Sequence, residues 1–135
     1  FNLNGLRKEP EEVNAVMESG GHLFTASLSD TNGEHGEILS LLIDKDNEVQ
    51  SFVLSCRVFQ RKVEFLFLSI LLEKYFDKVK FNYIETNRNS PFKLFLDSFE
   101  NIDLTKDIYL SKSDIDLAES NLFKIFSNES ITIKL

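Results

Sequence analysis

The chain has 135 residues, the length of a single domain that can bury a core without disulfides or a structural metal. Its 22 acidic and 15 basic residues give a formal net charge of −7, which leaves no overall positive field to attract nucleic acid or anionic lipid. One cysteine excludes an internal disulfide framework and favours a reducing, cytoplasmic location, and no apolar run reaches the roughly 20 residues of a membrane span.

The first third of the chain predicts one helix and three strands. The strands are expected at Phe1–Leu6, His22–Leu28 and Glu37–Ile43, and the helix at Glu9–Ser19. Pro10 and the glutamates beside it open the helix, and Gly20 ends it. Turn-forming residues over Asp30–Gly36 connect the last two strands as a hairpin, so the sheet is expected to begin antiparallel.

The centre of the chain is a strand that leads through a polar turn into an apolar helix. The strand is expected at Glu48–Leu54, the turn at Ser55–Lys62 and the helix at Val63–Phe76, which is apolar on most faces and therefore buried. A further strand at Val79–Ile84 should lie parallel to the first, through a right-handed crossover. Because amides at a helix N-terminus attract anions, the functional site is expected at the turn.

The last part of the chain predicts two helices and two strands. The helices are expected at Pro91–Phe99 and from Ser113, as the cap, to Phe126; the strands are expected at Ile108–Leu110 and Ser130–Leu135. Acidic residues between Asp103 and Glu119 are expected to form a solvated face. The whole order predicts an α/β (α+β) fold with a mixed sheet, antiparallel first and parallel after, and helices on both faces.

This order, with its strand–loop–helix centre, resembles the GCN5-related N-acetyltransferase (GNAT) fold. The run FVLSCRVFQRKVE at Phe52–Glu64 is similar to the signature of the C-terminal acyltransferase-like domain of FkbH-type proteins, whose usual form is LSCRVLGRGVE. The resemblance extends to FNL at Phe1–Leu3, to DTNGEHGEI at Asp30–Ile38 and to the stretch from Tyr83 to Pro91, where the family carries YIPT.KN.P. It covers residues 1–100 and leaves the tail unplaced.

The resemblance implies an activity and a longer parent protein. FkbH-type proteins join a haloacid-dehalogenase-like phosphatase domain to this domain, and they load a glyceryl group from a phosphorylated three-carbon donor onto an acyl carrier protein thiol. Residues 1–135 are then one GNAT-like domain that follows such a phosphatase domain, in keeping with a first residue that is not methionine. The expected partners are the carrier protein and the upstream domain. No cofactor is expected; phosphopantetheine of the carrier, or coenzyme A, is the thiol substrate.

Cys56 is the candidate nucleophile, and His35 is a candidate general base. Arg57, Arg61, Lys62 and the helix N-terminus favour the Cys56 thiolate, which can hold the glyceryl group as a thioester before the carrier thiol takes it. The alternatives are that Cys56 is a small buried hydrophobe and that His35 is a solvated turn residue. No metal site is expected, because the two histidines lack partners at ligand spacing.

Four residues of the turn are candidates for binding substrate or phosphopantetheine. Arg57 can pair with a phosphate or carboxylate, or can bond loop carbonyls. Gln60 and Lys62 fill the two glycine positions of the loop that cradles diphosphate in acetyltransferases, so ordinary coenzyme A binding is disfavoured. The charges of Arg61 and Lys62 can instead hold the phosphate of phosphopantetheine, or can be solvated.

Two further candidates follow the parallel strand. Asn89 can contact the pantetheine arm or cap the next helix, and Tyr83 can face the site or the core. Leu96 stands where acetyltransferases commonly place a tyrosine that protonates the leaving thiolate. Three functions therefore stay open: the FkbH-type acyltransferase-like domain, a catalytically degenerate module that docks a carrier protein or its phosphatase domain, and a free-standing N-acetyltransferase.

Overall fold

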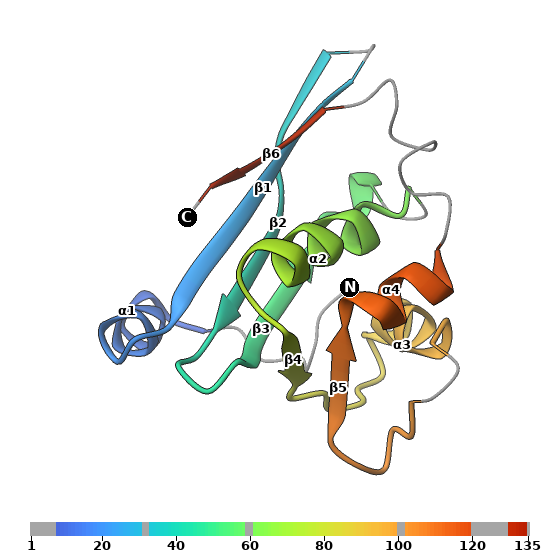
Figure 1. The fold of residues 1–135 in the computed structure, drawn as a ribbon. Helices are drawn as coiled ribbons and strands as arrows, with labels where there is room; N and C mark the ends of the chain where they lie inside the picture. Colours follow the sequence, from blue (N-terminus) through green and yellow to red (C-terminus); the bar gives the residue numbers. More distant parts are fainter. Residues whose placement is uncertain (1–7, 31–32, 59–60, 100–101, 120–129, 135) are drawn as a thin grey trace.

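The computed structural model describes residues 8–30, 33–58, 61–99, 102–119 and 130–134. Six strands form one mixed sheet in the order β5-β4-β3-β2-β1-β6, and helices pack against it (Figure 1), which confirms the predicted α+β class. The elements in chain order are α1 (Pro10–Glu18), β1 (His22–Asp30), β2 (Gly33–Ile43), β3 (Glu48–Leu54), the 3₁₀ turn η1 (Cys56–Val58), α2 (Val63–Lys74), β4 (Lys78–Phe81), α3 (Ser90–Asp97), β5 (Ile108–Ser111), α4 (Lys112–Ala118) and β6 (Ser130–Lys134).

The sheet is antiparallel except between β3 and β4, which run parallel. Helix α2 connects these two strands, so the predicted strand–helix–strand unit is confirmed. The expected parallel arrangement does not continue beyond β4. The loop after α3 returns the chain to the end of β4, where Ile108 pairs with Phe81, and β5 therefore runs antiparallel.

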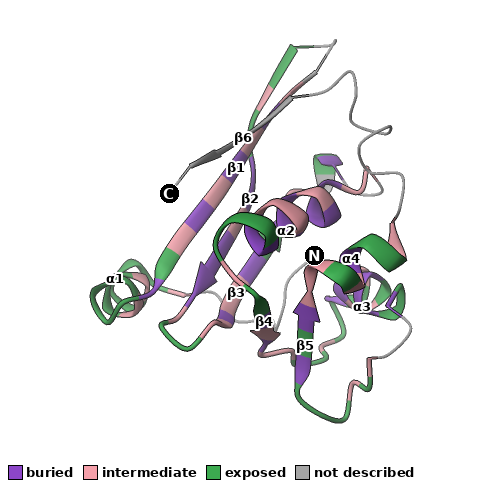
Figure 2. Ribbon diagram, viewed as in Figure 1, coloured by how far each residue is buried: buried purple, intermediate pink, exposed green. Residues whose placement is uncertain are grey.

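Phenylalanine rings fill the space between the sheet and the helices. Phe52 of β3 is fully buried, and its ring centroid lies 6.3 Å from Phe67 of α2, 6.2 Å from Phe81 of β4 and 5.9 Å from Phe92 of α3. Such ring pairs contribute about 0.5–1.5 kcal/mol each beyond the area that they bury. Helices α2 and α3 therefore share one face of the sheet, and Figure 2 shows buried residues along α2 and the strands beside it.

Helix α2 is the most buried helix of the described chain, as its all-round apolar sequence predicts. Seven of its 12 residues are buried, so the helix lacks the broad polar face that a surface helix exposes to solvent. It ends at Lys74, two residues before the predicted end. The amides of Tyr75 and Phe76 both donate to the carbonyl of Leu71, and this shared acceptor closes the last turn.

Helix α1 lies at the beginning of β1 (Figure 1), and Gly21 makes that junction possible. A Cβ atom on Gly21 would stand 2.6 Å from the carbonyl oxygen of Ile43 and 2.7 Å from the Val16 side chain. No residue of α1 is fully buried. The helix is therefore held mainly by this close approach and by one partly buried apolar stripe.

Two predictions for the end of the chain need correction. Helix α4 begins at Lys112 with Ser111 as its cap, not Ser113, and the Ser111 amide donates to Asp114 Oδ2 at 2.8 Å. The helix ends at Ala118, well before the predicted Phe126, because Glu119 leaves the helical conformation with φ −140°. The predicted strand Phe1–Leu6 lies outside the described residues. In the described ranges, no helix has the length and apolar character needed to cross a membrane.

Candidate functional site

Cys56 begins the turn that joins β3 to α2. The Ser55 amide donates to the carbonyl of Ile38 at 2.7 Å, which holds the start of the turn against β2. The Val58 amide then donates to the carbonyl of Ser55 at 3.1 Å, and the Val58 side chain is fully buried. The backbone of Cys56 is therefore fixed between the sheet and the core.

The strand that leads to Cys56 has an open edge. β3 pairs with β4 only at Glu48–Lys80 and Val49–Phe81, whereas its pairing with β2 continues to Leu54. The bond between Ser55 and Ile38 fixes the antiparallel alternation, so the backbone polar groups of Leu54 point away from β2. No described strand pairs with that side of β3 past Val49. An extended ligand with amide groups can pair with such an edge.

Arg57 supports the turn from its exposed side. Its Nε donates to Ser55 Oγ at 3.1 Å, and its Nη2 donates to the carbonyl of Glu37 on β2 at 3.3 Å. The bond to a carbonyl is the structural role that the sequence left open as an alternative. Because a guanidinium has five N–H donors, this role leaves donors for a ligand.

Lys62 stands directly before α2 in the left-handed backbone region, with φ 64°. Its Nζ lies 2.5 Å from Oε1 of Glu119, the residue that follows α4. The Lys62 charge is thus engaged, and Glu119 is not part of a solvated face: its side chain is only 18% exposed. Sequence analysis missed this partner because 57 residues separate the two side chains.

Glu64 places a second carboxylate beside this pair. Its side chain is 8% exposed, and its Oε2 has no hydrogen-bond partner among the described residues. Desolvation raises the pKa of Glu64, and the charge of Glu119 raises it further, while a backbone hydrogen bond and Lys62 act in the opposite direction. The charges of Glu64, Glu119 and Lys62 therefore interact at the start of α2, where Glu119 contacts the Lys62 ammonium group.

The loop after β4 is held by Asn89, which is 1% exposed. Its Oδ1 accepts a bond from the Thr86 amide at 2.8 Å, and its Nδ2 donates to the carbonyl of Ile84 at 2.7 Å. The predicted capping of α3 by this side chain is wrong, since no side-chain cap bond exists there. Asn89 instead closes the loop that precedes the helix.

Tyr83 lies in the same loop and packs against the core. Its ring stacks on Phe92 with centroids 5.8 Å apart and an interplanar angle of 15°. Its hydroxyl is buried without a hydrogen-bond partner in the described chain. Burial raises the pKa of Tyr83, and the charges of Glu85 and Asp97 add to the effect. The predicted contact of Tyr83 with a ligand stays a prediction.

The structure brings several predicted residues to one end of the sheet. His35 belongs to β2 and not to a turn, because the hairpin continues to the pair Asp30–Gly33. It lies two residues from Glu37, which Arg57 contacts, so His35 and Cys56 share this end. Because β3 and β4 are parallel, Cys56 and the loop with Tyr83 both follow carboxyl ends of neighbouring strands.

Two residues of the predicted site add less. Gln60 lies outside the described residues, and Arg61 is half-buried in the bend before α2. The described chain holds no group of three or more histidine, cysteine, aspartate or glutamate side chains placed to bind a metal ion.

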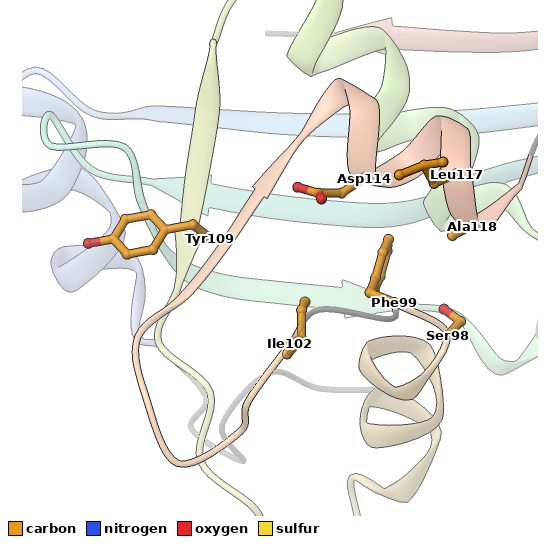
Figure 3. Close-up of a pocket in the computed structure, with 7 residues that line it drawn as sticks. All are labelled: Ser98, Phe99, Ile102, Tyr109, Asp114, Leu117 and Ala118. Atoms are coloured by element: carbon orange, nitrogen blue, oxygen red, sulfur yellow. The ribbon is translucent and has the colours of Figure 1, made fainter.

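A separate pocket of about 180 Å³ lies between α3, β5 and α4. Figure 3 shows Phe99 and Leu117 approaching it from different elements, with the Asp114 carboxylate nearby and the Tyr109 ring projecting away. None of the predicted site residues lines it; its lining is Ser98, Phe99, Ile102, Tyr109, Asp114, Leu117 and Ala118. No motif in the sequence indicated this pocket, because its lining comes from the segment after α3, from β5 and from α4.

Comparison with known proteins does not identify a family for the chain. No protein-family model, no curated protein and no solved structure matches it. Its function is therefore argued from the turn at Cys56, the open edge of β3 and the residues around them.

Proposed function

We propose that the chain is the acyltransferase-like domain of an FkbH-type protein. It helps to transfer a glyceryl-type acyl group from a phosphorylated three-carbon donor to the thiol of an acyl carrier protein. The observation that carries the proposal is the junction of β3 and α2, where Cys56 lies one residue beyond the end of a strand with an open edge. The four residues of the SCRV motif begin this junction.

Cys56 acts as the covalent carrier of the acyl group. Its thiolate forms a bond to the activated acyl carbon of the donor, and the donor's leaving group departs with the electrons of the bond that breaks. The carrier thiol then loses its proton to His35 and attacks the same carbon. Cys56 leaves as a thiolate, and His35 releases the proton to solvent, which restores the starting state.

The phosphopantetheine arm of the carrier lies along β3 in this proposal. Its amide groups pair with the backbone of Leu54, whose polar groups face away from β2. Its thiol then reaches Cys56 at the end of the strand, and Arg57, Arg61 and Lys62 supply positive charge for its phosphate. Gln60 and Tyr83 stay predicted contacts of the same arm, whereas Asn89, with both amide atoms bonded inside its loop, supports the loop.

The conformation of Lys62 supports the resemblance on which the proposal draws. The FkbH-type signature carries glycine at this position, and glycine adopts a left-handed backbone without steric cost. Lys62 has φ 64°, in the same region. The turn therefore has the backbone form for which the signature's glycine is suited, although a side chain now occupies the position.

Intact-mass spectrometry of the full-length protein tests the proposal. The protein is incubated with a phosphorylated glyceryl donor, with and without phosphopantetheinylated carrier. We expect a glyceryl adduct on Cys56 that disappears when carrier is added, and we expect Cys56→Ala to lose both the adduct and the loading of the carrier. Ser51→Ala, on the same strand but outside the turn, is the matched control and should keep both. Full loading by Cys56→Ala would exclude the covalent role.

The binding module is a second candidate function, and the internal contacts of the turn favour it. Arg57 bonds β2, Lys62 pairs with Glu119, and the fully buried Leu96 offers no proton donor. If the domain only docks a carrier, the carrier should bind wild-type protein and Cys56→Ala with equal affinity, and neither protein should become acylated. Titration of carrier into the two proteins distinguishes this function from transfer.

A free-standing N-acetyltransferase is the third possibility. It requires coenzyme A to bind beside Lys62, whose Cβ occupies a glycine position of the diphosphate loop. Binding would raise the melting temperature, because a ligand that binds only the folded protein stabilises it by RT ln(1 + L/Kd), where L is the free ligand concentration. We expect no such shift with acetyl-coenzyme A.

A further inference from the structure

The end of α4 is tied to the turn that carries Cys56. Glu119 follows α4 directly, and its side chain is mostly buried where it meets Lys62 Nζ. Helix α4 also packs against α2, which begins one residue after Lys62 (Figure 1). The contact therefore joins the tail of the chain to the N-terminus of the central helix.

The position that Glu119 occupies is suited to an anion. Lys62 contributes its ammonium group, and α2 begins there without any side-chain cap bond from its N-cap residue. Amides in the first turn of a helix carry partial positive charge, so they attract a carboxylate or a phosphate. The Glu119 carboxylate is the anion that the ammonium holds now, and a phosphate would compete for the same donor.

Glu64 is a buried group beside this ion pair whose hydrogen-bonding capacity is not fully used. Its buried carboxylate has one oxygen without a hydrogen-bond partner in the described chain, and it lies close enough to Glu119 for their charges to interact. Two like charges beside a single ammonium repel each other. The ionised form of Glu64 therefore competes with Glu119 for the charge of Lys62.

We propose that Glu119 is a built-in competitor for the phosphate of the phosphopantetheine arm. It occupies Lys62 in the free protein, and the phosphate must displace it before the arm can lie along β3. This inference rests on the proposed function, since it assigns a regulatory contact to the same site. Removal of the Glu119 charge frees Lys62 and should tighten the binding of the phosphate.

Titration calorimetry with 4′-phosphopantetheine tests this competition, and pantetheine, which lacks the phosphate, is the control ligand. We expect Glu119→Gln to tighten 4′-phosphopantetheine by about fivefold, the factor that corresponds to a partly buried ion pair. The affinity for pantetheine should not change. Asp116→Asn is the matched control, because it removes one charge from the exposed side of the same helix, where Asp116 pairs with Lys112. It should bind like wild type.

Two further variants keep the test decisive. In a Lys62→Met background, Glu119→Gln should no longer change the affinity, which assigns the gain to the pair. If Glu119→Gln lowers the melting temperature strongly, Glu119→Asp withdraws the carboxylate by one methylene and should give a smaller gain. Equal or weaker binding by the Glu119 variants would overturn the inference, and so would the absence of phosphate-dependent binding in every protein.

The outcome can be separated from that of the proposed function. Loading of the carrier through Cys56, together with unchanged binding in Glu119→Gln, would reject the competitor and keep the transfer. Tighter phosphate binding in Glu119→Gln, together with no adduct on Cys56, would keep the competitor and reject the transfer.

Discussion

Lys62 has a left-handed backbone, which lowers the free energy of unfolding, and a partly buried ion pair with Glu119, which raises it. A left-handed conformation costs a residue with a Cβ about 1–2 kcal/mol. A partly exposed ion pair contributes about 0.2–1 kcal/mol, and its partner Glu119 is the less exposed of the two. The balance between these terms can be measured at this single position.

We expect Lys62→Gly to change the free energy of unfolding by less than about 0.5 kcal/mol, because relief of the backbone offsets the lost pair and the added flexibility of glycine. Lys74→Gly, in the right-handed last turn of α2, is the matched control and should lose about 1 kcal/mol. Urea denaturation measures both. A larger loss at Lys62 than at Lys74 would mean that the ion pair outweighs the strain.

Glu64 should make stability depend on pH. Its pKa in the folded protein is raised above the ordinary value of 4.5, chiefly by desolvation. The neutral form is therefore favoured by folding, and its contribution is fully present below the unfolded pKa and is lost as the pH rises through the folded pKa. Glu64→Gln keeps the neutral form at every pH.

We expect Glu64→Gln to unfold with a free energy on the order of 1 kcal/mol above wild type at pH 8 and close to wild type at pH 4. Thermal unfolding at the two pH values measures the difference. Glu73→Gln, on the exposed side of the same helix, should show no such pH dependence relative to wild type. A Glu64→Gln protein that is less stable than wild type at pH 8 would contradict the assignment.

Among the structural elements, the loop between β4 and α3 depends on a single side chain. Asn89 satisfies the Thr86 amide and the Ile84 carbonyl from a buried position, so its removal leaves both groups without a partner. We expect Asn89→Ala to lose about 2 kcal/mol of unfolding free energy, whereas Asn87→Ala, two residues away and exposed, should lose less than about 0.5 kcal/mol. Chemical denaturation compares them. Equal losses would show that the loop does not depend on these bonds.

The elements that the sequence predicted well are those with strong local patterns. β3 occupies Glu48–Leu54 and α2 begins at Val63, both as predicted, because an apolar run between turn residues specifies them locally. The sequence predicted the wrong cap residue for α4, and the cause of that error is physical. Ser111 and Ser113 each precede an aspartate by three residues, so the sequence holds the same capping pattern twice. Only the end of β5 decides between them.

At the scale of the whole molecule, the sequence predicted the parallel pair of β3 and β4, because a single helix joins them. The direction of β5 was not accessible in the same way, since it depends on how far the loop after α3 returns. The candidate site could likewise be predicted only in part from the sequence. Local signals placed Cys56 at the junction, but they could not show that Lys62 meets Glu119 or that Asn89 closes its loop.

The stacking of Tyr83 on Phe92 gives the protein an optical reporter. The chain has three tyrosines and no tryptophan, so all of its intrinsic fluorescence comes from tyrosine. Tyr75 and Tyr109 are about half exposed, whereas Tyr83 has a buried hydroxyl and lies beside the strand edge that leads to Cys56. Occupancy of that edge should therefore alter the emission of an unlabelled sample, and Tyr83→Phe should remove the change.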